Sequence, residues 1–324
     1  NYVPAWPHRS SAVPPLATGR MVTDMGRADS LANPGRVCIM ASHTNLTATP
    51  TAIPRQAWSV LVVSTLAFTV CFMVWMMFGV IGIPLKKSLG LSATEFGLLT
   101  ATPVLTGSLI RVPLGIWTDR YGGRVVMALL MAATVPAIWL MSYATAYWHF
   151  LVIGLFVGLA GGSFSVGTPY VARWFPKARQ GMAMGVYGAG NSGSAVNKFA
   201  APALLAIGGW TLVPQVYAAI MLGTVIVFWL GSSSDPKHLV PSNVKFTDQL
   251  KMLKDPKVLK YCQYYSIVFG GYVALALWMV QYYVGEFGLT IQTAALLAAC
   301  FSLPGGVLRA VGGVLSDKFG AHHV

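Results

Sequence analysis

The chain has 324 residues, of which 55% are hydrophobic and only 10% are charged, and its mean hydropathy is +0.63. Soluble domains carry about 25% charged residues, so this composition argues against a soluble enzyme. The net charge of +13 would suggest nucleic-acid binding in a soluble protein, but in a membrane protein it reports topology. The four cysteines lie far apart without a CxxC pair, which argues against a zinc site or a disulfide framework.

Residues 1–55 are rich in Pro, Ser, Thr and Ala without a sustained period, so we expect a disordered N-terminal tail. Thirty residues without a formal charge follow, from Gln56 to Leu85, which is enough for one transmembrane helix. Further apolar stretches predict eight spans in all: 56–85, 96–117, 125–144, 148–172, 181–207, 213–231, 261–283 and 293–315.

The longest polar interruption among these spans covers residues 232–259. It predicts a cytoplasmic linker between a six-helix bundle at 56–231 and a partial second bundle at 260–324. The fold class expected from this pattern is therefore an all-α, multi-pass membrane protein embedded in a lipid bilayer.

The basic residues are distributed unequally between the two sides of the predicted membrane. Seventeen of the 22 Lys and Arg fall in the tail and in the connections on the same side, whereas only Lys86 and Lys87 fall on the other. This asymmetry predicts that the N-terminus lies in the cytoplasm, and we expect the protein to lie in the inner (cytoplasmic) membrane. Because topology accounts for most of the charge, we expect no nucleic-acid partner.

An internal repeat appears when the sequence is shifted by 198 residues, which aligns 90–124 with 288–322 without a gap. Eleven of the thirty-five positions are identical, and apolar identities carry little weight in membrane segments. The informative pairs are polar or conformationally special: Gly107/Gly305, Arg111/Arg309, Gly115/Gly313, Asp119/Asp317 and Gly122/Gly320. Parallel repeats of this kind relate the two halves of major facilitator transporters.

The loop at 115–124, GIWTDRYGGR, resembles the GxxxDRxGGR loop of the major facilitator superfamily. We expect a tight Gly-Gly turn whose Asp119, Arg120 and Arg124 pair across the cytoplasmic ends of helices. Asp317 and Lys318 repeat this gating loop in the second copy. Because a second half of equal length would extend about four helices beyond Val324, we expect the chain to be a fragment of a twelve-helix transporter.

Only three formally charged residues fall within the predicted spans, namely Arg111, Lys198 and Arg309. Each costs about 3 kcal/mol at the centre of a bilayer, so each is a candidate functional residue. No acidic residue in the spans neutralises them, and two symmetry-related guanidiniums therefore favour an anionic substrate held through two oxygens. The alternative is that they bond to backbone carbonyls or to carboxylates elsewhere in the protein.

A glycine-rich run, GVYGAGNSGSAVNKFAAP, occupies 185–202. Glycine and serine allow the close approach of a neighbouring helix or of a small ligand, and helix contact alone explains any single glycine. Asn191 strengthens the case for a ligand, because an amide in the bilayer needs hydrogen-bond partners.

Together with Arg111 in TGSLIRVPLG and Arg309 in LPGGVLRAVGG, this run resembles the nitrate/nitrite porter family over residues 56–324. The resemblance implies that the two arginines clamp the anion and that Asn191 donates a hydrogen bond to it. It further implies that aromatic rings sandwich the planar anion. The remaining substrate-binding residues implied in this way are Phe164, Tyr265, Phe269, Gly190 and Gly193.

Lys198 departs from the glutamine or small polar residue expected at its place in some family members. It follows Asn191 by seven residues, about two helical turns, so the two share a helix face. The lysine either extends the positive pathway, or snorkels, or pairs with another part of the protein.

The resemblance implies a monomeric secondary active transporter of nitrate and nitrite, used in nitrate assimilation, with no cofactor and no metal. Two mechanisms stay open. The lack of carboxylates in the spans favours nitrate/nitrite exchange, whereas the AVNKFAAP segment resembles that of proton-linked nitrate importers.

The alternative function is antiport of another small anion such as an organic phosphate. A haem-binding membrane subunit is disfavoured, because only His149 lies in a predicted span.

Overall fold

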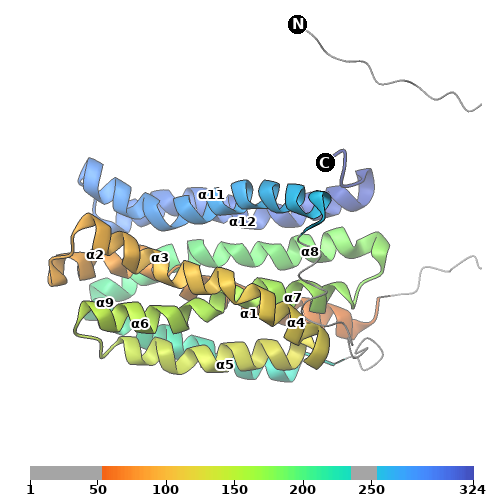
Figure 1. The fold of residues 1–324 in the computed structure, drawn as a ribbon, viewed down its shortest axis with the longest axis horizontal. Helices are drawn as coiled ribbons and strands as arrows, with labels where there is room; N and C mark the ends of the chain where they lie inside the picture. Colours follow the sequence, from red (N-terminus) through yellow and green to blue (C-terminus); the bar gives the residue numbers. More distant parts are fainter. Residues whose placement is uncertain (1–52, 235–253) are drawn as a thin grey trace, which may run out of the picture. The chain divides into compact units, whose positions relative to one another are not determined.

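The computed structural model describes residues 53–234 and 254–324, and all regular structure in these two ranges is helical (Figure 1). Within these two ranges, seven helical segments are long and apolar enough to cross a membrane. The prediction of an all-α membrane protein is therefore confirmed. The predicted tail, except for its last three residues, and the central part of the predicted linker lie outside the described residues.

The helices follow the predicted spans closely. Four segments consist of consecutive elements: α1 (Arg55–Trp75) with α2 (Phe78–Leu89); α3 (Ala93–Leu109) with α4 (Arg111–Tyr121); α6 (Tyr147–Val157) with η1 (Gly158–Gly162) and α7 (Ser163–Ala172); and η2 (Lys177–Arg179) with α8 (Gln180–Gly188), η3 (Ala189–Ser192) and α9 (Gly193–Gly231). The other three described segments are the single helices α5 (Gly123–Met141), α11 (Pro256–Phe287) and α12 (Ile291–Phe319).

The fifth and sixth predicted spans form a single apolar segment of 55 residues that ends with α9. The helix is interrupted at Gly208 and Gly209, where Gly209 has φ 72° and ψ −171°. Glycine tolerates this conformation because it has no Cβ. The eight predicted spans therefore appear as seven apolar segments, one of which contains two spans separated by this kink.

Both copies of the internal repeat have the same local geometry. Gly90 and Gly288, which end the helices before the repeat, share a φ of 62°, and Gly122 and Gly320 have φ 85° and 82°. The helix that begins each copy is capped by a side-chain hydroxyl, from Ser92 for α3 and from Thr290 for α12. Equivalent sequence positions thus adopt equivalent backbone conformations.

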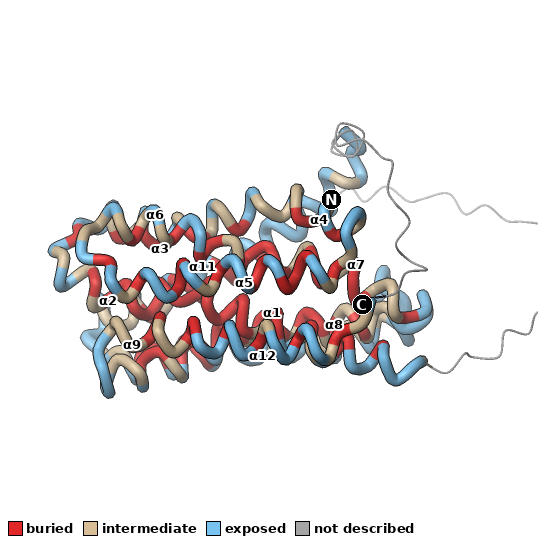
Figure 2. The backbone as a smooth tube through the Cα atoms, turned by 90° about the horizontal axis from the view of Figure 1, so that it is seen from below, coloured by how far each residue is buried: buried red, intermediate tan, exposed pale blue. Residues whose placement is uncertain are grey.

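Close packing between α8, α9 and α12 joins the first six spans to the last two. A Cβ on Gly185 would meet the backbone of Arg309 and Ala310, and one on Gly306 would lie 2.5 Å from the backbone nitrogen of Ser192. Small residues at these positions let the helices approach closely. In Figure 2 buried positions lie along the helix faces turned toward neighbouring helices, and exposed positions line the outer faces of the bundle.

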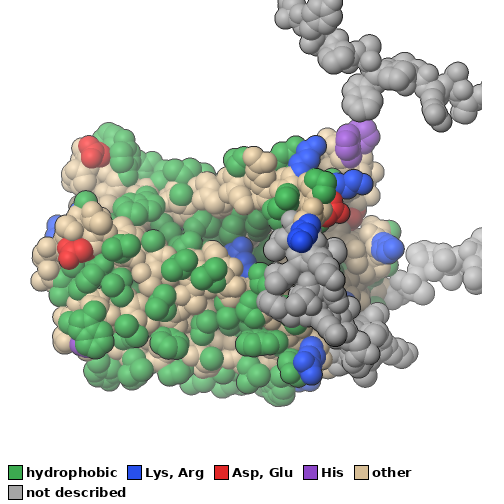
Figure 3. Space-filling model, in the orientation of Figure 1, with side chains coloured by type: hydrophobic (Ala, Val, Ile, Leu, Met, Phe, Trp, Pro, Cys, Tyr) green, Lys and Arg blue, Asp and Glu red, His purple; other side chains and the backbone are tan. Residues whose placement is uncertain are grey.

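Charged side chains gather toward the two ends of the bundle in Figure 3, and the surface between them is largely hydrophobic. Exposed apolar residues such as Val268, Leu308 and Leu230 cover the outer faces, as expected for helices in contact with lipid. One basic side chain lies in a hollow in the middle of the face shown in Figure 3. A cation at this depth requires a local explanation.

Candidate anion-binding site

The two arginines predicted from the repeat converge on one aromatic ring. The guanidinium carbon of Arg111 lies 5.1 Å from the centre of the Phe269 ring, and that of Arg309 lies 5.8 Å from the same centre. The two guanidinium carbons are therefore at most about 11 Å apart, the sum of those distances. The structure brings together three of the residues that the resemblance implied.

Arg111 begins α4, directly after the slight irregularity at Ile110 that separates α3 from α4. Its guanidinium also lies 5.8 Å from the Trp75 ring of α1, and the indole Nε1 donates a hydrogen bond to the Pro103 carbonyl over 2.8 Å. Its Nε is buried and has no hydrogen-bond partner in the described part of the chain. A buried N–H without an acceptor is costly, so a ligand oxygen would satisfy it.

Arg309 lies in the middle of α12, where its Nε donates a long hydrogen bond of 3.4 Å to the Gly305 carbonyl. Its guanidinium also lies 5.7 Å from the Tyr272 ring of α11. Among the described residues, neither arginine forms a salt bridge. Both guanidiniums are thus held by aromatic faces and lack carboxylate partners, so the site has excess positive charge.

Three nearly parallel aromatic rings lie together beside the arginines. Phe164 of α7 lies nearly parallel to Phe269, with ring centres 6.5 Å apart and planes 21° apart, and it also stacks on Tyr265 at 6.2 Å. Tyr265 and Phe269 stack at 5.1 Å. The predicted aromatic residues are therefore neighbours, contributed by α7 and α11, and they bring flat apolar faces to the charged centre.

Asn191 lies in η3, the short 3₁₀ turn between α8 and α9, and is fully buried. Its Nδ2 donates to the Gly188 carbonyl over 2.7 Å, and its Oδ1 has no partner among the described residues. The amide nitrogen carries a second hydrogen that remains for a ligand. The backbone carbonyl of Asn191 accepts from the Tyr272 hydroxyl, which connects this turn to the α11 residue beneath Arg309.

Gly190 and Gly193 lie against α1. A Cβ on Gly190 would overlap the ring of Phe68, and a Cβ on Gly193 would overlap the Thr69 carbonyl and lie 2.8 Å from the Met73 nitrogen. Helix contact therefore explains the glycine at both positions. The same contacts set how closely the turn that carries Asn191 approaches α1.

Lys198 belongs to a buried polar cluster, defined here as Ser194, Lys198, Tyr272 and Ser302. Its Nζ donates to the Ser194 carbonyl over 3.3 Å and to the Ser302 Oγ over 2.9 Å. The Tyr272 hydroxyl lies 2.9 Å from the Ser194 Oγ and 3.0 Å from the Ser302 carbonyl. This cluster connects α9 to both α11 and α12.

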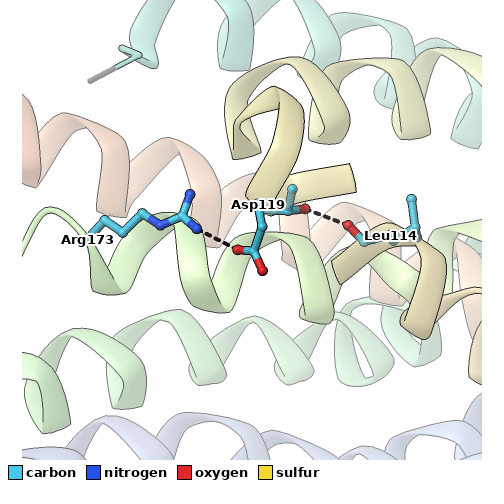
Figure 4. Close-up of polar contacts among 4 residues, drawn as sticks. Leu114, Asp119 and Arg173 are labelled. Carbon is cyan, nitrogen blue, oxygen red and sulfur yellow. Dashed lines mark hydrogen bonds and ion pairs between the residues drawn. The ribbon is translucent and has the colours of Figure 1, made fainter. Parts of the chain in front are cut away.

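The first gating loop makes contacts on two sides. Asp119 of α4 forms an ion pair with Arg173, the residue that directly follows α7 (Figure 4). Arg124 donates to the Trp229 carbonyl over 2.7 Å near the end of α9, and its guanidinium lies 4.3 Å from the Trp229 ring. Arg120 is exposed and contacts the Tyr121 ring. Asp119 thus pairs with Arg173, next to α7, and not with Arg120 or Arg124 of its own loop.

The second gating loop contacts the other half of the chain. The carboxylate of Asp317 accepts hydrogen bonds from the backbone nitrogens of Gly181 and Met182, over 2.8 Å and 2.7 Å, at the start of α8. A negative charge at a helix N-terminus is stabilised by the free N–H groups and by the helix dipole. Lys318 is exposed.

Two residues of the site were missed in the sequence. Trp75 faces Arg111, and Tyr272 faces Arg309 and joins the polar cluster. Tyr272 follows Phe269 by three residues, so helical spacing places both on one face and could have identified it. Nothing in the sequence around Trp75 distinguishes it from other apolar residues of α1.

The described residues contain no group of three or more His, Cys, Asp or Glu side chains that could hold a metal ion. Two guanidiniums, an amide and aromatic faces lie at the site, and groups of this kind can bind an anion.

The profile of the Major Facilitator Superfamily matches residues 63–324. A solved bacterial homolog of the human lysosomal transporter Spinster, in an inward-facing and occupied conformation, has a similar fold, with a TM-score of 0.64 and 20% identity over 83% of this chain and 63% of that one. The chain belongs to the Major Facilitator Superfamily, whose members are transporters and not enzymes.

Similar curated proteins define a narrower group. The chain is 44% identical over 278 residues to the "Probable nitrate/nitrite antiporter NarK1" of Thermus thermophilus, covering 82% of this chain and 62% of that protein. It is 33% identical over 256 residues to the "Nitrite extrusion protein" of Bacillus subtilis, covering 78% and 64%, and 31% identical over 268 residues to the "Probable nitrate transporter NarT" of Staphylococcus epidermidis, covering 82% and 68%. Within the superfamily, the chain belongs to the nitrate/nitrite porter family, and it spans about two thirds of the length of these relatives.

Proposed function

We propose that the protein is a secondary active transporter that moves nitrate, and nitrite, across the cytoplasmic membrane by alternating access. The observation that carries this proposal is the convergence of Arg111 and Arg309 on Phe269 without a carboxylate partner among the described residues. Two positive charges in an apolar bundle repel each other, and a bound anion relieves this repulsion. The names of the three relatives identify nitrate and nitrite as the anions to test first.

The shape of the site suits a flat anion. Nitrate is planar, and a guanidinium donates two parallel hydrogen bonds to a pair of oxygens. A flat ion between two parallel rings needs about 7 Å between them, twice the contact distance of about 3.5 Å. The 6.5 Å between the ring centres of Phe164 and Phe269 is an upper limit on the separation of their planes, so the rings must move apart to admit the ion between them.

We assign the remaining residues by their contacts. Asn191 supplies its second amide hydrogen to the anion, and Tyr265 extends the aromatic wall. Gly190 and Gly193 act indirectly, by letting the Asn191 turn lie against α1. An organic phosphate is disfavoured, because the tetrahedral phosphate group does not fit between parallel rings.

Alternating access requires two units that rock about the site, and we assign these to residues 56–231 and 260–324, joined by the linker at 232–259. The contacts of Asp317 with the start of α8 would lie between these two units, whereas the Asp119–Arg173 pair lies within the first. Opening on the Asp317 side therefore breaks its bonds to α8 and leaves the Asp119 pair intact.

The predicted orientation places the N-terminus and both gating loops on the cytoplasmic side of the inner membrane. We expect a monomer without a cofactor or a nucleic-acid partner. Cysteine labelling tests the orientation. Lys87→Cys should react with a membrane-impermeant maleimide from outside intact cells, and Lys257→Cys should react only after the membrane is opened. The reverse pattern would invert the topology.

Anion binding tests the function itself. The protein, expressed from its complete reading frame, is titrated with nitrate, nitrite and inorganic phosphate while tryptophan fluorescence is followed, since Trp75 lies beside Arg111. We expect saturable changes with nitrate and nitrite, and none with phosphate. A saturable response to phosphate alone would favour the alternative function.

A further inference from the structure

Among the described residues, Lys198 is the one buried cation whose role the anion clamp does not explain. It is 2% exposed, and its ammonium donates only to two neutral oxygens, the Ser194 carbonyl of α9 and the Ser302 Oγ of α12. Over the described ranges, no Asp or Glu forms a salt bridge with it. An ammonium without a carboxylate partner in this setting is costly, and a bound anion nearby would lower that cost.

Few titratable or charged groups lie on the elements around Lys198. Tyr272 of α11 hydrogen-bonds within the same cluster. On α12, Arg309 follows Ser302 by seven residues, which corresponds to about 10 Å along a helix. Tyr217 lies on α9 itself, and α12 also carries Cys300, Asp317 and Lys318. The other elements that pack against α9 bring Arg55 and the buried Cys71 on α1, Lys86 and Lys87 at the end of α2, and Arg124 at the start of α5.

We infer that Lys198 is the proton-binding residue of the transporter, and that its amine takes up one proton with each nitrate that Arg111 and Arg309 hold. The proton comes from water on the side where nitrate enters, adds to the Nζ lone pair, and returns to water on the other side. This inference rests on the proposed function. It selects proton-linked import over obligatory nitrate/nitrite exchange.

Charge balance explains why the two ions would move together. In the empty site the two guanidiniums repel a third positive charge and so disfavour a proton on Lys198. With Lys198 neutral, the site carries a net charge of +2. Bound nitrate removes one positive charge, and a proton on Lys198 restores it. The loaded and the empty site then carry the same net charge, so each rocking step moves the same charge through the membrane.

The hydrogen bonds of Lys198 connect this charge to the conformation of the protein. The bond to the Ser302 Oγ joins α9 to α12, which belong to different proposed units, and Tyr272 adds a third helix to the same cluster. A charge-assisted hydrogen bond is stronger than a neutral one. The protonated lysine therefore stabilises the closed contact between α9 and α12 while nitrate is bound.

Nitrate binding and protonation of Lys198 strengthen each other by the same factor, which Coulomb's law estimates. Two unit charges about 10 Å apart at an effective dielectric constant of about 20 change each other's binding by about tenfold. Nitrate should accordingly bind about tenfold more tightly at mildly acidic than at mildly alkaline pH, and its binding should raise the protonation of Lys198 by the same factor.

The direct test is proton uptake during nitrate binding. Purified protein from the complete reading frame is mixed with sodium nitrate in weakly buffered detergent solution containing a pH indicator, and nitrate binding is followed separately by tryptophan fluorescence. We expect the solution to become more alkaline by up to one proton per bound nitrate. This wild-type measurement does not depend on whether any variant folds.

Two variants and a control assign the proton. Lys198→Met should bind nitrate with an affinity that does not change with pH and without proton uptake, whereas Lys198→Arg, which stays charged, should bind with the tighter affinity, again without uptake. Lys87→Met, which removes an exposed lysine, should behave like the wild type. Nitrate binding without proton uptake, or uptake that persists in both Lys198 variants, would overturn the inference and leave the proposed function intact. Absence of any nitrate response would overturn both.

Discussion

Replacing either clamp arginine by lysine keeps the charge but removes the planar fork. In Arg111→Lys the side chain loses its stacking against Trp75 and Phe269, and in Arg309→Lys it loses the stacking against Phe269 and Tyr272. The ring contacts exist without the anion, so their loss, about 1 kcal/mol per contact, lowers the stability of the protein and not its affinity for nitrate. Loss of one charge-assisted hydrogen bond to the anion costs about 2 kcal/mol, which predicts that nitrate binds about 30-fold more weakly in each variant.

Nitrate titrations and uptake by reconstituted vesicles measure this loss. The matched control is Arg120→Lys. Arg120 is exposed, and among the described aromatic residues its guanidinium contacts only the ring of the neighbouring Tyr121. The control should bind nitrate normally, and all three variants should retain the thermal stability of the wild type within a few degrees. Wild-type nitrate affinity in both Arg111→Lys and Arg309→Lys would refute the two-arginine clamp.

Three further predictions concern packing, stacking and the gating loop. Gly193→Ala should lower the stability by about 1–3 kcal/mol, because its Cβ would overlap the α1 backbone, whereas Gly223→Ala, with open space around it, should not; equal melting temperatures would contradict this. Phe164→Leu should weaken nitrate binding about three- to tenfold through loss of about 1 kcal/mol of stacking, and an unchanged titration would exclude the sandwich. Asp317→Asn should lower the stability by about 0.5 kcal/mol, because the start of α8 loses a negative charge, and a higher melting temperature would show that this charge is unfavourable.

The positions of the membrane helices were predictable because a bilayer imposes a simple requirement. Long uncharged stretches must be helical when no water is present to bond the backbone, and hydropathy identifies them. The exception is the merging of the fifth and sixth predicted spans into one helical segment. Hydropathy does not show whether a short Gly208-Gly209 interruption is a loop or a kink, since that depends on how the two helices pack.

The arginines were predictable for a related reason. A charge in an apolar span is costly, so its repetition 198 residues later indicates a role in both halves of the fold. The contacts of Asn191 were less predictable. Its amide donates to Gly188 one turn earlier, because the 3₁₀ turn at Ala189–Ser192 brings that carbonyl within reach, and nothing in the sequence distinguishes this turn from continuous helix.

Trp75 shows the limit of reasoning from sequence alone. Aromatic residues are common in membrane helices, and their role depends on the partner that faces them across the bundle. Trp75 faces Arg111 only because α1 and α3 pack closely near Pro103, a contact between distant parts of the sequence. Pairings of this kind follow from the three-dimensional arrangement and not from local pattern.

The most direct test of the central claim is nitrate entry into liposomes that contain the purified protein from its complete reading frame. We predict saturable nitrate uptake that nitrite inhibits, that inorganic phosphate does not inhibit, and that is lost when Arg111 and Arg309 are both replaced by lysine. Uptake that persists in this double variant, or the absence of nitrate uptake under both a proton gradient and nitrite loading, would contradict the account.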